Sequence, residues 1–190
     1  IVNAIFNNHK QVLMVMDNGI TAMTGHQPNP NTGEKSKGAR LFSKYANTQT
    51  ISIDETLKAW GVQFVRRIPA YDEDQVLRAL EDAFEFSEKN ETIAVVIQEE
   101  PCALMRSRFE RKQGTLPNPY YIDHEVCRNI KKCLEEFACP AIEDIEGQAQ
   151  INTDLCIGCG CCVQTCPMLD KPIKQMSDKP KKIGRASCRE

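Results

Sequence analysis

The 190-residue sequence lacks several features that define whole classes of protein. It has no apolar run of the roughly 20 residues that a membrane-spanning helix needs, so we expect no membrane span. Its 24 Lys and Arg against 26 Asp and Glu give a net charge of −2, without the basic excess typical of nucleic-acid binding. Residues 1–101 contain neither a secretory signal nor a cysteine, which disfavours an extracellular disulfide framework.

Both ends of the sequence predict a piece of a longer protein. The first residue is Ile1 and not Met, and residues 1–6 have the pattern of a helix entered part-way. The last eight residues, 183–190, back-translate into a common sequencing-library adapter, so we expect translated adapter there and not protein. A genuine basic tail is the alternative, and sequencing the gene across the Lys182 codon decides between the two.

Continuous apolar runs predict buried strands of a parallel sheet. Residues 11–16 (QVLMVM) and 92–97 (TIAVVI) lack the alternation of a half-exposed strand, which is typical of central strands covered on both faces. Residues 62–68 predict a further strand. Strands and helices that alternate along the chain predict an α/β fold with a doubly wound parallel sheet.

Two helices are predicted between these strands. Asp54 is the expected N-cap of a short helix that continues through Trp60. Asp72 is the expected N-cap of a longer helix, with Gln75 three residues on. The apolar face predicted for this longer helix consists of Val76, Leu80, Ala83 and Phe84.

The periodicity ends after Pro101, and Pro117-Asn118-Pro119 marks a linker before a cysteine-rich unit. We predict an α/β domain over residues 1–105, a linker over 106–119, a small α+β ferredoxin-like domain over 120–174, and a tail over 175–190. The ferredoxin-like domain itself has the pattern of two related halves.

The second half of this domain carries a strong iron–sulfur signature. Three cysteines spaced two residues apart and a fourth that precedes Pro167 form the bacterial [4Fe–4S] ferredoxin run. Gly158 and Gly160 keep the loop between them free of Cβ clashes. Zinc sites share such pairs, but the three evenly spaced cysteines with Cys-Pro favour iron–sulfur. The run consists of Cys156, Cys159, Cys162 and Cys166.

The first half repeats this run with a gap. Cys127, Cys133 and Cys139-Pro140 are present, but Ile130 stands where a second cysteine belongs. The fourth cysteine of each run ligates the other cluster. The predicted sets are therefore Cys156, Cys159, Cys162 with Cys139, and Cys127, Cys133 with Cys166.

Three readings of the three-cysteine set stay open: a [3Fe–4S] cluster, a [4Fe–4S] cluster with an atypical ligand, or no cluster. Cys161 and Cys102 are expected to be spectators.

The first predicted strand ends at Asp17-Asn18-Gly19, followed by a long loop over residues 18–40. Long loops in compact domains are usually functional. Alone, this turn is adequately explained as an Asx turn, and His26 as a structural histidine. The strings MDNGITAMTGHQPNP at 16–30 and EPCAL at 100–104, together with the ferredoxin run, favour a functional site instead.

With these strings, residues 1 to about 175 resemble the large (alpha) subunits of the indolepyruvate ferredoxin oxidoreductases, a thiamine-diphosphate-dependent family of 2-oxoacid:ferredoxin oxidoreductases. The resemblance implies that residues 1–105 are the C-terminal part of a thiamine-diphosphate-binding domain whose Gly-Asp motif lies before Ile1. It implies that the Asn18 side chain and the Ile20 carbonyl hold Mg²⁺, an ion that prefers oxygen ligands. Thr24, Gly25 and Gln27 are further expected cofactor-binding residues.

The resemblance also implies a cytoplasmic enzyme that converts an aryl 2-oxo acid such as indolepyruvate, with coenzyme A, to an acyl-CoA and CO2. Electrons would pass through the iron–sulfur clusters to ferredoxin, and a beta subunit would be a partner. The alternatives are a non-catalytic iron–sulfur electron-transfer module, or a sibling enzyme for pyruvate or branched-chain 2-oxo acids. Residues 1–182 alone are expected to be inactive, because the Gly-Asp motif and the pyrimidine-side domain are absent from them.

Overall fold

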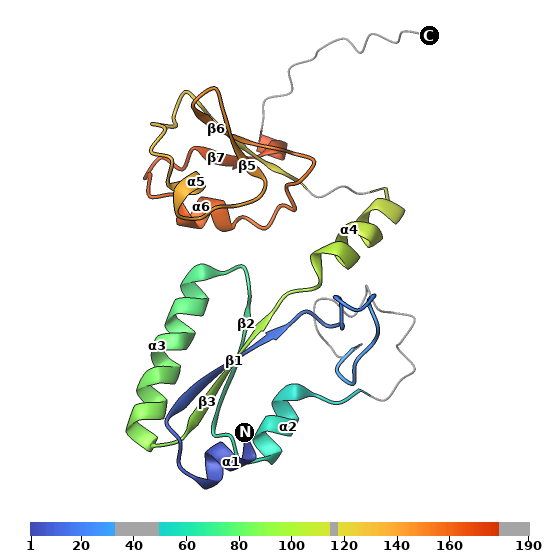
Figure 1. Cartoon of the computed structure of the whole chain (residues 1–190), viewed down its shortest axis with the longest axis vertical. Helices are drawn as coiled ribbons and strands as arrows, with labels where there is room; N and C mark the ends of the chain where they lie inside the picture. Colours follow the sequence, from blue (N-terminus) through green and yellow to red (C-terminus); the bar gives the residue numbers. More distant parts are fainter. Residues whose placement is uncertain (33–49, 115–117, 179–190) are drawn as a thin grey trace. The chain divides into compact units, whose positions relative to one another are not determined.

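The computed structural model describes residues 1–32, 50–114 and 118–178. The chain divides into two compact units, Ile1–Leu116 and Pro117–Glu190 (Figure 1). The suspected adapter residues 183–190, with Cys188, and the part of the predicted long loop beyond Thr32 lie outside the described residues.

The first unit is built on a parallel sheet of three strands in the order β1-β3-β2, which confirms the predicted α/β class. The strands are β1 (Gln11–Asp17), β2 (Phe64–Pro69) and β3 (Ile93–Glu99). In register, Glu99 lies beside both Asp17 and Pro69, so all three strands end at one edge of the sheet.

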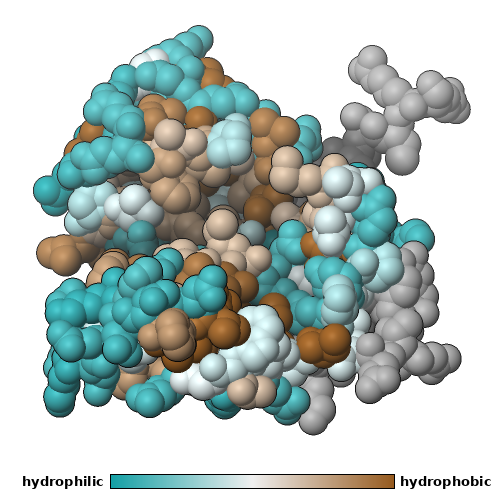
Figure 2. All heavy atoms as spheres, turned by 60° about the horizontal axis from the view of Figure 1, so that its bottom comes forward, coloured by the Kyte–Doolittle hydropathy of each residue, from teal (hydrophilic) through white to brown (hydrophobic). Residues whose placement is uncertain are grey.

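Only β3 is a central strand among those described. Its first five residues are fully buried, as the continuous apolar run predicted. The same prediction was wrong for β1, which pairs only with β3 in the described sheet and leaves Met14 and Met16 exposed. An apolar run indicates a capacity for burial on both faces, and it does not fix the place of a strand in the sheet. Figure 2, in which the first unit is turned toward the viewer, shows hydrophobic patches in brown among hydrophilic side chains on the surface.

Helices cover both faces of this sheet, as a doubly wound fold requires (Figure 1). α3 (Glu73–Asn90) packs Ala79 and Ala83 against one face. α1 (Val2–Phe6) and α2 (Ile53–Ala59) pack against the other face, where Leu57 is buried. The core of the unit is therefore the two faces of β3.

The structure corrects several local predictions in this unit. Ser52, and not Asp54, is the N-cap of α2, because its side chain accepts the Glu55 N–H. Phe84 is 59% exposed and lies off the buried face of α3. β2 begins at Phe64 rather than at residue 62. The predicted Asp72 cap of α3 is confirmed, since its carboxylate accepts the Gln75 N–H at 3.0 Å.

A fourth helix, α4 (Ala103–Lys112), follows β3 where the sequence indicated an end of regular structure. No side chain caps its N-terminus and none of its residues is fully buried, so neither of the usual sequence signals is present. Among the described residues, no helix is both long enough and apolar enough to cross a membrane.

The second unit consists of two halves with the same order of elements. The first half runs from β4 (Tyr120–Ile122) through α5 (Lys132–Glu135) to β5 (Ile142–Ile145). The second runs from β6 (Gln148–Ile151) through α6 (Cys161–Thr165) to β7 (Ile173–Gln175), and a 3-10 helix, η2 (Met176–Asp178), follows. β4 pairs antiparallel with β7, and β5 with β6, so each half lends a strand to the other. This confirms the two predicted halves.

Candidate functional site

The first candidate site lies where the strands of the parallel sheet end. Asn18 follows β1 directly and is exposed. Its side-chain oxygen accepts the Ile20 N–H at 3.1 Å, which closes an Asx turn, and its carbonyl accepts the Cys102 N–H at 3.2 Å. The turn is thereby tied to the segment between β3 and α4, and Gly19 accommodates it with a φ of 72°.

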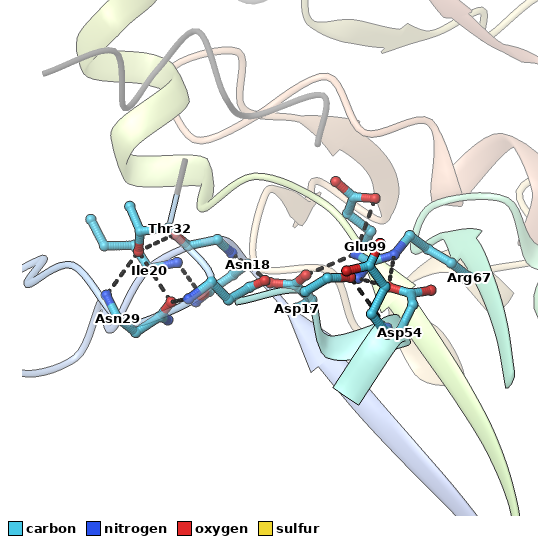
Figure 3. A network of polar contacts seen from close by, with 12 residues as sticks. Asp17, Asn18, Ile20, Asn29, Thr32, Asp54, Arg67 and Glu99 are labelled. Carbon is cyan, nitrogen blue, oxygen red and sulfur yellow. Dashed lines mark hydrogen bonds and ion pairs between the residues drawn. The ribbon is translucent and has the colours of Figure 1, made fainter. Parts of the chain in front are cut away.

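Asp17 fixes this turn from inside the unit. One carboxylate oxygen accepts the Gly19 N–H at 3.0 Å and the Asn31 side-chain amide at 2.8 Å. The other oxygen pairs with Arg67 at 2.8 Å. Figure 3 shows Asp17 between the Asn18 turn and Arg67. The side chain is only 5% exposed, so these partners, and not water, compensate for the burial of its carboxylate.

Arg67, on β2, joins three carboxylates from three different segments. Besides Asp17 it pairs with Asp54, at the start of α2, and with Glu99, at the end of β3, at 3.3 Å (Figure 3). Burial by itself lowers the pKa of the Arg67 guanidinium, but the hydrogen bonds and charges of Asp54 and Asp17 outweigh burial and raise that pKa. Arg67 is therefore the cation that holds this edge of the sheet together.

Thr32 connects the loop that follows β1 to the Asn18 turn through its hydroxyl group. Its hydroxyl accepts the Asn29 N–H at 2.8 Å and lies 2.9 Å from the Gly19 carbonyl, to which it can donate. The residue is 1% exposed. The backbone around Asn18 is therefore held by fixed contacts on both sides.

Residues 21–27 form a small closed loop in which Thr21 and Gln27 exchange backbone hydrogen bonds. The Thr24 hydroxyl donates to the Gln27 side-chain oxygen, and the Gln27 amide donates to the Thr24 carbonyl at 2.6 Å. Gly25 has a φ of 114°, a conformation that favours glycine. Thr24, Gly25 and Gln27 are all exposed, so the loop presents them to solvent as a unit.

A cavity of about 400 Å³ opens beside Asn18 and Asp17. Its apolar lining includes Val15 of β1, Leu57 of α2 and Trp60, the C-cap residue of α2. Asn29, Pro30 and Asn31 also line it. An apolar wall with a few polar groups is typical of a cofactor site.

The oxygen atoms at the Asn18 turn are suitable ligands for Mg²⁺. The Asn18 side-chain oxygen and the Ile20 carbonyl are both oxygen ligands, and they lie in one turn. No described N–H donates to the Ile20 carbonyl, while its buried side chain, 2% exposed, anchors it. These two groups can therefore supply part of an oxygen-only coordination shell.

The second candidate site is in the ferredoxin-like unit, where the structure brings four cysteines together around Cys162. Burial, the largest cause, and the neighbouring charges of Cys159, Cys156 and Cys139 together raise the pKa of the Cys162 thiol to about 12. Among the described His, Cys, Asp and Glu side chains, no three share the close geometry of a single metal ion. Cys139 comes from the first half and the other three come from the second, as the crossed spacing implies.

A separate set forms around Cys133. Burial raises the pKa of its thiol, and the charges of Cys127 and Cys166 add to this effect. These three cysteines line one small cavity of about 20 Å³ with Ile130. Ile130 therefore lies at the set with three thiols, where the sequence places the missing cysteine.

The loop around Ile130 keeps the backbone conformation of the complete run. Gly158 and Gly160 have positive φ angles of 71° and 82°, and Asn129 and Lys131 have positive φ angles of 53° and 62° at the matching positions. α5 and α6 each begin directly after the second of these residues. The first half thus retains the wrapping loop although one thiol is replaced by an apolar side chain.

The glycines of the complete run are required by space as well as by φ. A Cβ on Gly158 would lie 2.9 Å from the Asn118 carbonyl oxygen, and one on Gly160 would lie 3.0 Å from the Tyr120 hydroxyl. The Tyr120 N–H also donates to the Cys156 sulfur at 3.4 Å. β4 therefore packs directly against the cysteine loop, and this confirms the predicted reason for the two glycines.

Comparison with known proteins identifies two domains in the chain. Residues 1–97 match the family model described as "Thiamine pyrophosphate enzyme, C-terminal TPP binding domain". The chain belongs to the thiamine pyrophosphate enzyme family. Residues 149–168 match the "4Fe-4S binding domain" model, so the chain combines a thiamine pyrophosphate-binding domain with an iron–sulfur domain.

Similar proteins include three that are named "Indolepyruvate oxidoreductase subunit IorA". The protein of Pyrococcus horikoshii is 35% identical over 169 residues, which are 88% of this chain and 24% of the relative. That of Archaeoglobus fulgidus is 32% identical over 88% of this chain and 25% of the relative. That of Thermococcus kodakarensis is 32% identical over 92% of this chain and 26% of the relative. The chain thus spans about a quarter of the length of these relatives. No solved structure matches it significantly.

Sequence reasoning missed the residues that hold the Asn18 turn. Local sequence patterns identify Asp17 only as part of a turn, and they do not identify Arg67. The two are 50 positions apart, and only the parallel pairing of β1, β3 and β2 brings them to one edge. A buried-strand prediction that contains an arginine is a usable signal, because such a residue needs a charged partner.

Proposed function

We propose that the chain is part of a thiamine-dependent oxidoreductase that decarboxylates an aryl 2-oxo acid such as indolepyruvate. The products would be CO2 and, with coenzyme A, an acyl-CoA, while the electrons leave through iron–sulfur clusters to ferredoxin. The observation that carries this proposal is the presence of a thiamine pyrophosphate-binding domain and an iron–sulfur domain in one chain. The names of the similar proteins support the 2-oxo acid class.

The residues at the Asn18 turn have binding and positioning roles in this proposal. Bound thiamine diphosphate supplies the electron sink that makes loss of CO2 from a 2-oxo acid feasible. Asn18 and the Ile20 carbonyl would help to hold the Mg²⁺ that accompanies this cofactor, and Thr24, Gly25 and Gln27 would contact the cofactor. Asp17 and Arg67 would keep the turn in place. The apolar wall of the neighbouring cavity, with Leu57 and Trp60, would exclude water.

The cysteines would hold two clusters of different kinds. Cys156, Cys159, Cys162 and Cys139 supply four thiols for a [4Fe–4S] cluster. Cys127, Cys133 and Cys166 supply three, and we propose a second cluster there with three cysteine ligands. The retained loop conformation around Ile130 supports a site that still binds iron. Thiolate ligation requires reduced cysteines, which agrees with a cytoplasmic location.

Turnover of the complete gene product tests the proposal. The protein that contains this chain, purified anaerobically with its beta subunit, should reduce an added ferredoxin when given indolepyruvate, coenzyme A, Mg²⁺ and thiamine diphosphate. Asn18→Leu should abolish this activity and the Mg²⁺-dependent binding of thiamine diphosphate, while the iron content stays unchanged. Full activity in Asn18→Leu would contradict the role of the turn. Residues 1–182 alone should be inactive.

A non-catalytic electron-transfer module is the second candidate, favoured by the small, self-contained iron–sulfur unit. The upstream gene sequence separates the two: a Gly-Asp motif before Ile1, with a further domain bearing a Glu for the thiamine pyrimidine, supports catalysis. Comparison of indolepyruvate with pyruvate and branched-chain 2-oxo acids as substrates separates the sibling enzymes.

A further inference from the structure

A second cavity in the first unit lies apart from the one beside Asn18. It measures about 480 Å³, within the usual range for ligand sites, and no residue lines both cavities. One wall is the tip of the closed loop, Gly25 and His26, and the other is α4. The proposed function assigns no role to α4, and of the residues that line this cavity it gives only Gly25 a contact with the thiamine cofactor.

The α4 wall is strongly basic. Met105, Arg108, Phe109 and Lys112 have the spacing i, i+3, i+4 and i+7, so they share one face of the helix. Arg111 lines the cavity beside them. Arg108, Arg111 and Lys112 form no ion pair with any described residue, in contrast to Arg106, which pairs with Glu100 at 2.9 Å. The cavity thus collects three exposed cations and no acidic lining residue.

The helix itself explains only part of this charge. Arg111 and Lys112 lie in the last turn, where positive charge stabilises the C-terminal end of a helix. Arg108 lies one turn earlier and gains little from that effect. The charge on the cavity face therefore exceeds what the stability of α4 requires.

The loop wall adds a buried polar atom that has no hydrogen-bond partner among the described residues. Among the described residues, the Nε2 atom of His26 is buried without a hydrogen-bond partner. His26 also has a φ of 64°, and Gly25 has one of 114°, so the loop holds an uncommon conformation at this wall. Uncompensated buried polar atoms and strained residues cluster at ligand sites.

We propose that this cavity binds a phosphate group that carries no metal ion. Arginines pair with phosphate through two parallel hydrogen bonds, and a nearby imidazole N–H can add a further one. The cavity has cations but no carboxylate to hold Mg²⁺, unlike the oxygen donors at the Asn18 turn. If the proposed function holds, the 3′-phosphate and diphosphate of coenzyme A are phosphates of this kind, and this part of the inference rests on it.

Binding measurements on the full chain test the inference without turnover. Adenosine 3′,5′-bisphosphate, the nucleotide end of coenzyme A, and inorganic phosphate are titrated by calorimetry in the presence of EDTA. Arg108→Gln should weaken binding of the bisphosphate at least tenfold. His26→Asn should weaken it severalfold, and Asn tolerates the positive φ. Arg78→Gln, on the exposed face of α3, is the matched control and should have no effect.

The outcomes separate this inference from the proposed function. Loss of bisphosphate binding in Arg108→Gln, with thiamine diphosphate affinity unchanged, supports a phosphate site distinct from the thiamine site. This result stands even if the protein fails to oxidise any 2-oxo acid. Equal bisphosphate affinity in wild type and Arg108→Gln overturns the inference. So does a variant that weakens only Mg²⁺–thiamine diphosphate, because the cavity would then belong to the first site.

Discussion

Replacement of Arg67 by Met is the sharpest test of how the Asn18 turn is held. The substitution keeps most of the side-chain volume but leaves the carboxylates of Asp17, Asp54 and Glu99 facing one another without their cation. Asp17 is 5% exposed, so water cannot replace the lost partner there. We therefore expect the change to destabilise the first unit.

The magnitude follows from burial. Removal of one partner from a buried ion pair costs about 3–5 kcal/mol. The Arg67 side chain is 24% exposed and so only partly buried. The lower end of this range, about 3 kcal/mol, therefore applies. With a urea m-value of about 1–3 kcal/mol per M, the unfolding midpoint should fall by about 1–3 M.

The sequence offers both a probe and a control. Trp60 is the single tryptophan and lies in the first unit, so its fluorescence in a urea titration reports that unit alone. Arg66→Met changes the neighbouring residue, whose ion pair with Asp82 and stacking on the Phe64 ring are exposed or partly exposed. We expect it to cost only about 1 kcal/mol.

A local measurement accompanies the global one. Arg67→Met should speed hydrogen exchange at the Gly19 amide, because the Asp17 carboxylate that accepts it loses its anchor. Arg67→Lys, which keeps the charge, should give an intermediate result and remains informative if the Met variant does not fold. Equal urea midpoints and equal Gly19 exchange in Arg67→Met and Arg66→Met would refute the reasoning.

Three further predictions concern the ferredoxin-like unit. Gly158→Ala should lower cluster content strongly, because its Cβ would lie 2.9 Å from the Asn118 carbonyl oxygen, whereas Gly147→Ala, with similar φ but open space, should retain the cluster absorbance. Ile130→Cys should raise the iron count from about seven to about eight per chain and remove any [3Fe–4S] EPR signal; an unchanged count and spectrum would speak against the three-cysteine site. The hydrogen bond from Lys174 lowers the pKa of the Asp123 carboxyl below 3.8. The ion pair therefore stabilises the folded unit fully above pH 3.8, and this stabilisation is lost as the pH falls through the lower folded-state pKa. Lys174→Met should return this pKa towards 3.8 in an NMR titration, and an unchanged value would show that the pair does not form in solution.

Much of the fold could be predicted from local sequence patterns. The two apolar runs became β1 and β3, and Asp72 caps α3, because strands and caps depend on residues close together in the chain. The choice of Ser52 over Asp54 as a cap could not be predicted, since both are good caps two residues apart. The position of β1 at the edge of the described sheet depends on pairing across some 80 residues, which no local pattern encodes.

The candidate sites divide in the same way. Cysteine spacing alone predicts the two sets, because the wrapping loop is a local structure. The contacts around Asp17 depend on Arg67 and Asn31, which arrive from other segments. The basic cavity at α4 depends on a helix whose start and buried face have no sequence signature. Contacts between charged or polar residues that are far apart in the sequence therefore could not be predicted from it.

The central claim is that a 2-oxo acid delivers electrons to the clusters of this chain through thiamine diphosphate. EPR of the complete, anaerobically purified enzyme, frozen after addition of indolepyruvate and coenzyme A, tests it most directly. The account predicts a reduced [4Fe–4S] signal that requires thiamine diphosphate and disappears in Asn18→Leu, although dithionite still reduces that variant. Clusters that dithionite reduces, but that no 2-oxo acid reduces in the presence of thiamine diphosphate, would contradict it.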